Sequence, residues 1–301
     1  MLNVNRLRTL SEVARRGSFS AAADALDYTQ SAVSQQIATL EAETGTTLLE
    51  RHGRTVHLTA AGQTLVAHAD GILARLEAAE AALGAIAGLR GGRLRMASFP
   101  SAGGAIMPTA IAAFRAAHPL VELSLAEGEP EQVAPRLRAG ELDLALLFEF
   151  ADGPALAEGM ERTVLLEDPL HVALPAGHRL AGAPSVDIAD LAGEAWVQTA
   201  LRSPCALQVL RSCHAAGFEP HVAFESDDYQ TVQGLVAAGV GVALIPALAL
   251  SPQNKGVIIR PLSPAPPKRT VFAATPPAAR LVPAAPAMVE FIAAVAARRA
   301  A

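Results

Sequence analysis

The chain has 301 residues, of which 51% are hydrophobic, and it carries a formal net charge of -5 at pH 7 and two cysteines. This content is enough for substantial cores in two domains and excludes a largely disordered chain, and two cysteines exclude a disulfide scaffold. The acidic balance gives no global sign of a nucleic-acid binder. The sequence shows neither a secretory signal nor an apolar run of about 20 residues, so we expect a cytoplasmic protein that does not enter a membrane.

Three short helices are expected near the N-terminus. Apolar residues recur at helical spacing in residues 7–14, and Gly17 is well placed to end this first helix because glycine accepts a left-handed backbone. Ser18 or Ser20 can cap the second helix, and Thr29 can cap the third. The spacing predicts a compact helical trio.

The third helix, expected from Thr29 to Gly45, has two different faces. Its apolar side would face a core and consists of Val33, Ile37 and Leu40. The opposite side carries short, uncharged hydrogen-bonding groups from Gln30, Ser31, Ser34 and Gln35. Such groups can meet base edges in a DNA major groove without steric bulk. A polar face is also typical of any solvated helix, so this face alone does not establish DNA binding.

Residues 50–58 predict a small hairpin with Gly53 at its bend and Arg51 and Arg54 exposed. Arginines beside a helical trio can hold DNA phosphates and so fix the position of a reading helix without carrying sequence information. Two solvated arginines on a turn are the simpler alternative.

A long helix is expected from Thr59, about 45 Å in length at 1.5 Å per residue. Its apolar residues alternate spacings of four and three: Leu65, Ala69, Ile72, Leu76, Ala79, Leu83 and Ile86. Such a heptad pattern requires a partner, which could be the same chain. Gly88 and Gly91-Gly92 separate the helix from the rest of the chain, so we expect a dimer. Residues 1–58 carry six basic and six acidic side chains, so one copy of this region has no net charge to attract DNA. Two reading helices on a two-fold axis would compensate through their combined affinity.

After Gly92 the sequence alternates strands and helices, as parallel sheets require. The first expected set is a strand at 94–98, a helix at 102–117, a strand at 121–126, a helix at 131–139 and a strand at 142–148. The second set comprises strands at 171–174, 195–198, 221–225 and 242–245 with helices at 206–216 and 229–238. The chain then passes through a proline-rich connection to a strand at 270–274 and a helix from 287. Two such lobes predict a ligand cleft between them.

The segments FSAAADAL and TQSAVSQQIATLE, the hairpin ending in LTAAG, the long helix and the two lobes resemble the LysR-type transcriptional regulators over essentially the whole chain. The resemblance implies a multidomain fold. It consists of an α-helical winged helix-turn-helix domain at 1–58, a linker and dimerisation helix at 59–90, and an α/β two-lobed domain at 91–301, similar to periplasmic binding proteins. Lobe I is expected at about 91–165 and 268–301, and lobe II at about 166–267. The expected partners are double-stranded promoter DNA, a small-molecule effector and further copies of the chain. These copies are expected to form a homodimer, and two dimers a homotetramer.

The resemblance also implies DNA contacts. Gln30, Ser31, Ser34 and Gln35 match the family's reading-helix contacts, Arg51 matches its phosphate-binding arginine, and Thr29 and Arg54 complete the expected surface. The family often has proline at position 31 and arginine at position 35, so this chain lacks one charge there. It also places Glu50 beside Arg51.

Three segments are expected to form the walls of an effector site. Ser101 lies in the turn between the first strand and the first helix of the α/β region, where a hydroxyl and backbone N–H groups can hold an anion, and it resembles the family's carboxylate-holding position. The opposing wall matches Arg202, Ser203, Pro204 and Cys205, and the arginine would favour a carboxylate effector. Glu129 and Pro130 form the third wall. Simple capping by Ser101 and a solvated Arg202 are the alternatives.

Other function classes fit the sequence less well. We find no HExxH, GxSxG or P-loop pattern and no histidine cluster at metal-ligand spacing, so we expect neither an enzyme nor a metal or other cofactor. A secreted solute-binding protein would not explain the first ninety residues. A redox-sensing regulator of the same family, using Cys205 and Cys213, is the alternative within the preferred class. On one helix these cysteines would lie about 12 Å apart, too far for a disulfide, and we expect Cys213 to be a buried apolar residue.

Overall fold

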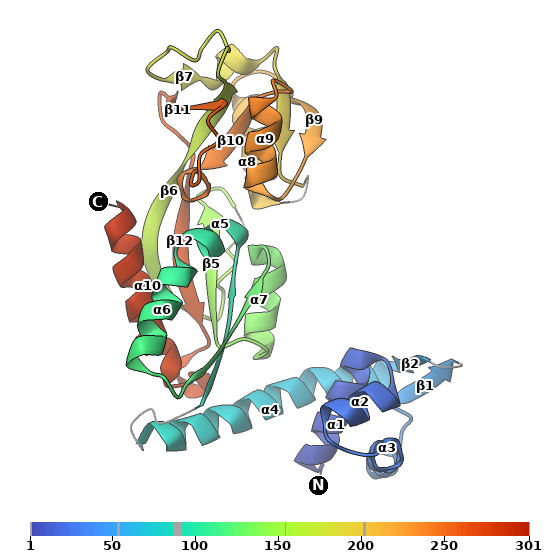
Figure 1. Ribbon diagram of the computed structural model, residues 1–301. Helices are drawn as coiled ribbons and strands as arrows, with labels where there is room; N and C mark the ends of the chain where they lie inside the picture. Colours follow the sequence, from blue (N-terminus) through green and yellow to red (C-terminus); the bar gives the residue numbers. More distant parts are fainter. Residues whose placement is uncertain (1, 53–54, 87–91, 154, 201–202, 301) are drawn as a thin grey trace.

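The computed structural model describes residues 2–52, 55–86, 92–153, 155–200 and 203–300 (Figure 1). Its N-terminal part contains helices α1 (Val4–Arg16), α2 (Phe19–Ala25) and α3 (Gln30–Thr44) and a hairpin of β1 (Leu49–His52) and β2 (Thr55–Leu58). The caps that the sequence predicts at four of these helix ends are confirmed. Gly17 and Gly45 follow α1 and α3 with φ of 65° and 68°, and the Ser18 and Thr29 side chains accept backbone N–H groups of α2 and α3.

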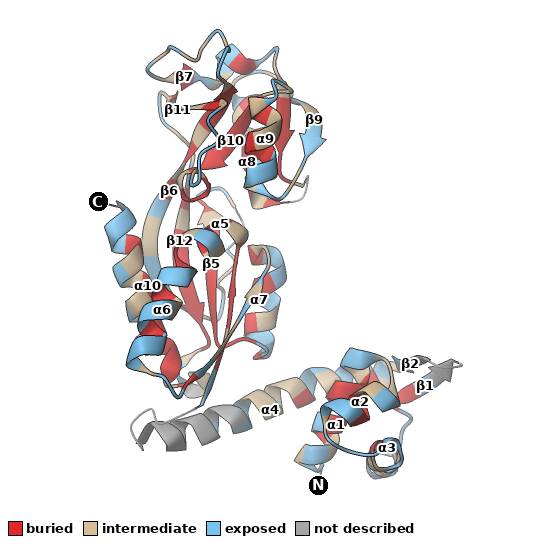
Figure 2. Ribbon diagram, viewed as in Figure 1, coloured by how far each residue is buried: buried red, intermediate tan, exposed pale blue. Residues whose placement is uncertain are grey.

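A single apolar cluster holds this unit together. Leu10 of α1, Val33 and Leu40 of α3, and Leu48 are all buried, and Ala69 of the following helix completes the cluster. Because α3 buries only this one side, its polar side remains on the surface (Figure 2).

Helix α4 (Ala60–Ile86) has 27 residues and spans about 40 Å at 1.5 Å per residue. Its first turns pack on α1, but Ile72 and Leu76 further along are 42% and 39% exposed. The middle of the predicted heptad pattern is therefore left uncovered by its own chain. Among the described helices, none combines the length and the apolar character needed to cross a bilayer.

Lobe I is a sheet with helices on both faces (Figure 1). Its strands are β3 (Arg93–Ser98), β4 (Glu122–Glu127), β5 (Leu144–Phe150) and β12 (Lys268–Thr275), in the order β4-β3-β5-β12. Strand β3 is parallel to β4 and β5, and β12 is antiparallel to β5. One face is covered by α6 (Met107–Ala117) and α10 (Ala284–Ala300), and the other face by α7 (Pro130–Ala139).

The prediction of a single helix at 102–117 is wrong. The structure has α5 (Pro100–Ala105) followed by α6, with a break at Ile106. Pro108 stands in the first turn of α6, where its missing N–H is tolerated, but it cannot continue the hydrogen-bonding pattern of the preceding helix. The break leaves α5 as a short helix whose first turn carries Ser101.

Lobe II contains β7 (Val186–Asp187), β8 (Ala195–Gln198), β9 (His221–Glu225), β10 (Ala243–Pro246) and β11 (Val257–Ser263) with helices α8 (Pro204–Ala215) and α9 (Tyr229–Ala237). Short 3-10 turns lie at Ile188–Leu191, Ala247–Ala249 and Ala278–Arg280. The prediction of a proline-rich connection before the strand at 270–274 is also corrected, because β11 occupies part of this connection. Pro261 can belong to this strand because it pairs at the end of the ladder with β6, where little hydrogen bonding is lost.

The two lobes share one long strand, β6 (Glu161–Pro175), of which the sequence predicted only residues 171–174. Its first half pairs with β12 in lobe I, and its second half pairs with β10 and β11 in lobe II. The lobes are therefore joined by the continuous backbone of this strand, whose pairing with β12 shifts register between Val164 and Leu166.

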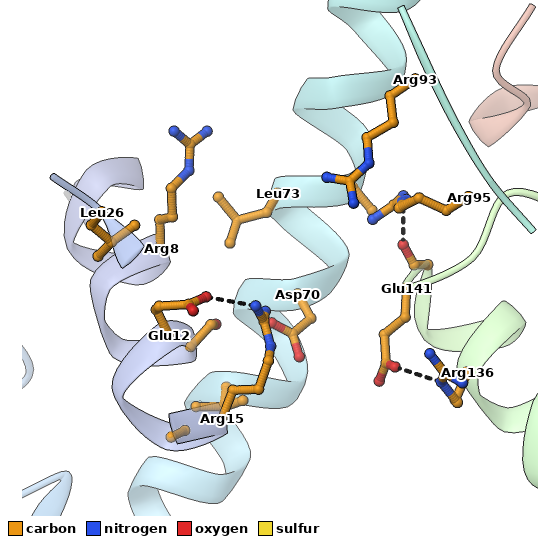
Figure 3. A pocket seen from close by; sticks show the side chains of 15 residues that line it. Arg8, Glu12, Arg15, Leu26, Asp70, Leu73, Arg93, Arg95, Arg136 and Glu141 are labelled. Atoms are coloured by element: carbon orange, nitrogen blue, oxygen red, sulfur yellow. Dashed lines mark hydrogen bonds and ion pairs between the residues drawn. The ribbon is translucent and has the colours of Figure 1, made fainter. Parts of the chain in front are cut away.

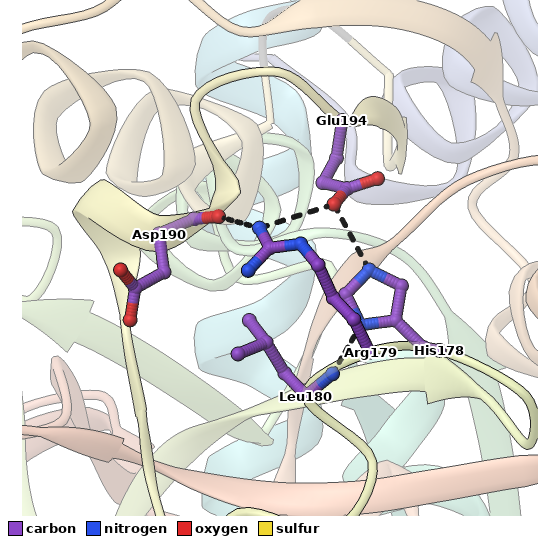
Figure 4. A network of polar contacts seen from close by, with 5 residues as sticks. All are labelled: His178, Arg179, Leu180, Asp190 and Glu194. Carbon is purple, nitrogen blue, oxygen red and sulfur yellow. Dashed lines mark hydrogen bonds and ion pairs between the residues drawn. The ribbon is translucent and has the colours of Figure 1, made fainter.

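A polar network fixes the outer loop of lobe II between β6 and β7 (Figure 4). Glu194 lies 3.0 Å from Nε2 of His178 and accepts from the Arg179 guanidinium, which also donates to the carbonyl of Asp190. Because His178 Nδ1 accepts the Leu180 N–H at 3.2 Å, a neutral His178 carries its proton on Nε2 and donates it to Glu194. This network stabilises the loop away from the interlobe cleft.

Candidate functional site

The polar face of α3 is presented as the sequence predicts. Thr29, Gln30, Ser31 and Gln35 are exposed and Ser34 is half-buried. Thr29 both caps the helix and lies 3.0 Å from the Ser31 hydroxyl, so the first turn is ordered by its own side chains. The amides and hydroxyls of this face can donate to or accept from a base edge.

Two contacts hold α3 against α1. The Thr9 hydroxyl donates to Gln36 at 2.6 Å, and Arg6 forms an ion pair with Glu43. Gln36 is thus turned toward the protein, whereas its neighbour Gln35 faces solvent. The hairpin is formed by β1 and β2, but Arg54 and the side chain of Arg51 lie outside the described residues.

The second site is a cleft between the lobes. Lobe I contributes Phe99, Pro100, Ser101, Glu129 and Arg269, and lobe II contributes Thr199, Ser203, Cys205 and Tyr229. The enclosed volume is about 10 Å³, which is room for roughly one water molecule. A larger ligand therefore requires the lobes to move apart.

Arg269, from the beginning of β12, is the central group of the cleft. It is 1% exposed, its Nε donates to Asp168 at 2.9 Å, and its Nη2 donates to the Ser101 hydroxyl at 2.6 Å. The guanidinium also lies 4.8 Å and 4.4 Å from the ring centroids of Phe99 and Phe148. Burial opposes the charge, but Asp168 keeps the pKa of Arg269 raised.

Cys205 lies near the start of α8, with its sulfur 3.7 Å from Arg269 Nη1. Burial raises the pKa of this thiol, while Arg269 and Tyr229 act in the opposite direction. Cys213 is fully buried, and burial raises its pKa to about 12, so the expectation of an apolar residue is confirmed. Both cysteines are on α8, where eight residues correspond to about 12 Å, more than the roughly 7 Å that a disulfide tolerates between Cα atoms.

Glu129 places a titratable carboxyl at the edge of the cleft. Burial raises its pKa to about 7, and Glu131 adds to the rise, whereas Arg269 opposes it. Since Asp168 already neutralises Arg269, Glu129 decides the charge of the cleft near neutral pH. The cleft is neutral when Glu129 is protonated and carries one negative charge when it is not.

The structure brings four of the predicted effector residues together: Ser101, Glu129, Ser203 and Cys205. Pro130 and Pro204 do not line the cleft, because each stands at the first position of its helix, α7 or α8. Arg202 lies outside the described residues. Among the residues that the structure describes, Arg269 is the arginine that lines the cleft.

Sequence reasoning missed Arg269, Asp168, Thr199 and Tyr229. The predicted strand at 270–274 begins one residue after Arg269, so the prediction leaves this residue outside the sheet. The signal in the sequence is that Arg269 directly precedes one predicted apolar strand, at 270–274, and Asp168 precedes another, at 171–174. Their partnership spans 101 residues in the sequence, which no local pattern shows.

Known proteins match both parts of the chain. The family described as bacterial regulatory helix-turn-helix protein, lysR family, matches residues 4–63, and the LysR substrate binding domain matches residues 87–297. The chain is 30% identical to the DNA-binding transcriptional dual regulator OxyR of Escherichia coli K12, over 90% of this chain and 88% of that protein. It is 31% identical to the transcriptional dual regulator GltC of Bacillus subtilis, over 97% of this chain and 96% of that protein.

A solved structure, that of a full-length OxyR variant from Pseudomonas aeruginosa, has the same fold with a TM-score of 0.76 and 24% identity, covering 98% of this chain and 97% of that one. Its fold and the two matching families agree with the helical unit and the two lobes described above. The chain therefore belongs to the LysR family, and it is a DNA-binding transcriptional regulator with an effector-binding domain.

Proposed function

We propose that the protein reads promoter DNA with the exposed face of α3 and changes its activity when a small effector binds between the lobes. The observation that carries this proposal is the α3 face, where uncharged Gln30, Ser31 and Gln35 are exposed on a helix fixed against α1. Thr29, Ser34, Arg51 and Arg54 complete the proposed DNA surface. Such a regulator acts where the chromosome is, so a cytoplasmic location belongs to the proposal.

The exposed Ile72 and Leu76 of α4 support a homodimer, in which two copies of α3 reach two half-sites. A pair of such dimers would give the tetramer. Dimerisation compensates for an α3 face that carries no charge, because two weak contacts linked together bind much more tightly than one.

The cleft supports a small effector, and we propose that it is an anion such as a carboxylate. Ser101 already accepts from Arg269, so its own hydroxyl hydrogen is free to donate. Thr199 and Ser203 share one hydrogen bond, which leaves one hydroxyl hydrogen of that pair available as well. These donors come from opposite lobes, so an anion held between them would stabilise one relative placement of the lobes. Glu129 must be protonated for such an anion to bind well.

Footprinting of the purified protein on the DNA upstream of its own gene tests this proposal. A protected pair of half-sites, whose extent changes when candidate carboxylates are added, is the expected result. Absence of any preference for duplex DNA over heparin would refute it.

Peroxide sensing through Cys205 is a second candidate. Relatives at 30% identity carry the name hydrogen peroxide-inducible genes activator, and Cys205 lines the cleft with its sulfur 3.7 Å from Arg269 Nη1. In this reaction the Cys205 sulfur attacks one oxygen of hydrogen peroxide, the O–O bond breaks, and a sulfenic acid and water are formed. Mass spectrometry after mild peroxide treatment would find the added oxygen on Cys205. A reversible Cys205–Cys213 bridge on a non-reducing gel would require α8 to unwind.

A further inference from the structure

A second and much larger cavity, of about 690 Å³, lies between the N-terminal unit and lobe I (Figure 3). Helix α1 forms one side with Arg8 and Arg15, α4 forms the floor, and lobe I forms the opposite side with Arg93, Arg95 and Arg136. Its volume falls in the range of roughly 300–1,000 Å³ that is usual for small-molecule sites. It is separate from the interlobe cleft, with which it shares no lining residue.

The lining of this cavity is basic in an acidic protein. Five arginines face three carboxylates, those of Glu12, Asp70 and Glu141, and Asp143 behind Arg95 adds a fourth, which leaves a net charge of +1 against -5 for the whole chain. Most of the arginines have carboxylate partners. Arg15 pairs with Glu12, Arg95 with Asp143 and Arg136 with Glu141.

Arg8 and Arg93 differ from the other three arginines. Both are exposed, they come from opposite sides of the cavity, and neither has a side-chain hydrogen bond or ion pair among the described residues. Their charges are therefore available to a ligand that reaches both sides.

Ser11 gives an independent indication of a ligand. It lines the same cavity and is only 5% exposed, yet its hydroxyl has no hydrogen-bond partner within the described part of the chain. A buried hydroxyl without a partner is costly, because it has lost water and gained nothing in return. A ligand oxygen would satisfy it.

The two sides of the cavity are held close to each other at Gly140. This residue ends α7 with φ of 82°, and a Cβ added there would lie 2.8 Å from the Cβ of Ala74 in α4. Glycine thus permits a direct contact between the linker helix and lobe I at the cavity wall.

We propose that this cavity binds a small phosphorylated molecule, whose phosphate is held by Arg8, Arg93 and Ser11. A phosphate monoester carries a charge of about -1.5 to -2 at pH 7, which matches the two arginines without partners in the described part of the chain, Arg8 and Arg93, and its three terminal oxygens can accept from donors on different sides. A planar monocarboxylate has one charge and two oxygens, and so would pair with only one of these two arginines. The ligand would connect the DNA-binding unit to lobe I.

Titration calorimetry of the full-length protein with inorganic phosphate and pyrophosphate tests this assignment. Saturable pyrophosphate binding is expected, and the double variant R8Q/R93Q should weaken it by at least about tenfold, since two charge-assisted contacts are lost. Both side chains are exposed, so the variant should fold, and R115Q, which removes an exposed arginine of α6, is the matched control. Ser11→Ala should also weaken binding, by a smaller factor.

Three outcomes would overturn the assignment. They are the absence of saturable binding to wild-type protein, an equal loss of affinity in R115Q, and a loss of pyrophosphate binding in S101A/S203A, which would place the probe in the interlobe cleft. The test does not depend on effector binding, because R8Q/R93Q leaves the cleft residues unchanged.

Discussion

The exposed face of α3 and the cleft between the lobes both use short polar side chains, but they hold them in opposite surroundings. On α3 these groups are solvated and uncharged, and the helix is held in place by the apolar residues on its other side. At the cleft, Arg269 and its partner Asp168 are each 1% exposed, and the Arg269 guanidinium lies over two aromatic rings. A change on α3 should therefore alter binding with little effect on folding, whereas a change in the cleft should affect both.

Asp168→Asn should have the largest effect. It leaves the Arg269 charge buried without its counter-ion, and removal of one partner of a buried pair costs about 3–5 kcal/mol of unfolding free energy. Urea unfolding measures this loss. The control is Glu141→Gln, which breaks the exposed pair with Arg136 and should change stability by less than about 1 kcal/mol. Equal losses in the two variants would contradict the contrast between buried and exposed polar groups.

Leu76→Glu tests the uncovered part of α4. If a second chain covers this face, a charge there becomes buried without a partner, and the dimer should weaken by about 2–3 kcal/mol, or roughly a hundredfold in Kd. Sedimentation velocity at several concentrations gives the change in Kd. Arg75→Gln alters the neighbouring exposed residue and should leave the dimer intact. An unchanged dimer in Leu76→Glu would place the interface elsewhere.

Glu129→Gln should change how stability depends on pH. The pKa of Glu129 is about 7 in the folded protein against 4.5 as its ordinary value, so the folded state binds more protons between these pH values and loses stability as pH rises through them. The neutral variant should be more stable than wild type by about 1–3 kcal/mol at pH 8 and equal to it near pH 4.5. Thermal unfolding at both pH values measures the difference.

The same variant also tests the proposed anion. Glu127, Glu131 and Asp227 surround Glu129 with further negative charge, and Arg269 is the nearby cation. Affinity of the wild-type cleft for a carboxylate should fall as pH rises through 7, and Glu129→Gln should remove this dependence. A pH dependence that persists in the variant would mean that another group controls the charge of the cleft.

Gln30→Ala should have the smallest effect on the protein and a selective effect on DNA. Loss of one amide contact to a base should reduce discrimination between operator and random DNA by about 1 kcal/mol or more, without measurable loss of stability. Arg51→Ala should instead weaken binding to both DNAs and reduce the salt dependence. Fluorescence anisotropy with the two DNAs at several salt concentrations separates the two roles. Equal losses on both DNAs in both variants would contradict them.

Local signals made most of the fold predictable. Gly17, Ser18 and Thr29 fix helix ends through their own backbone preferences or hydrogen bonds with residues two to four positions away, and the predicted helix ends follow them. Strand β6 was mostly missed because its partners β12 and β11 lie about a hundred residues later in the chain. Its first half also has exposed and half-buried residues, which reduces the apolar pattern.

The cleft shows the same limit. Ser101, Glu129, Ser203 and Cys205 are predicted from the family resemblance together with their places at or near helix starts, where the sequence marks a turn. Arg269 is missed because a buried arginine is improbable until its partner Asp168 is known. The two residues are 101 positions apart in the sequence and come into contact only in the folded protein.

The continuity of β6 through both lobes determines how the protein can respond to a ligand. A flexible linker would let the lobes swing apart freely, but a fifteen-residue strand bonded to neighbours along both halves resists bending. Rotation of one lobe against the other should therefore be taken up as torsion of this strand, including the register shift between Val164 and Leu166. Such an element behaves as a spring, which permits movements of small amplitude and restores the starting arrangement once the ligand dissociates.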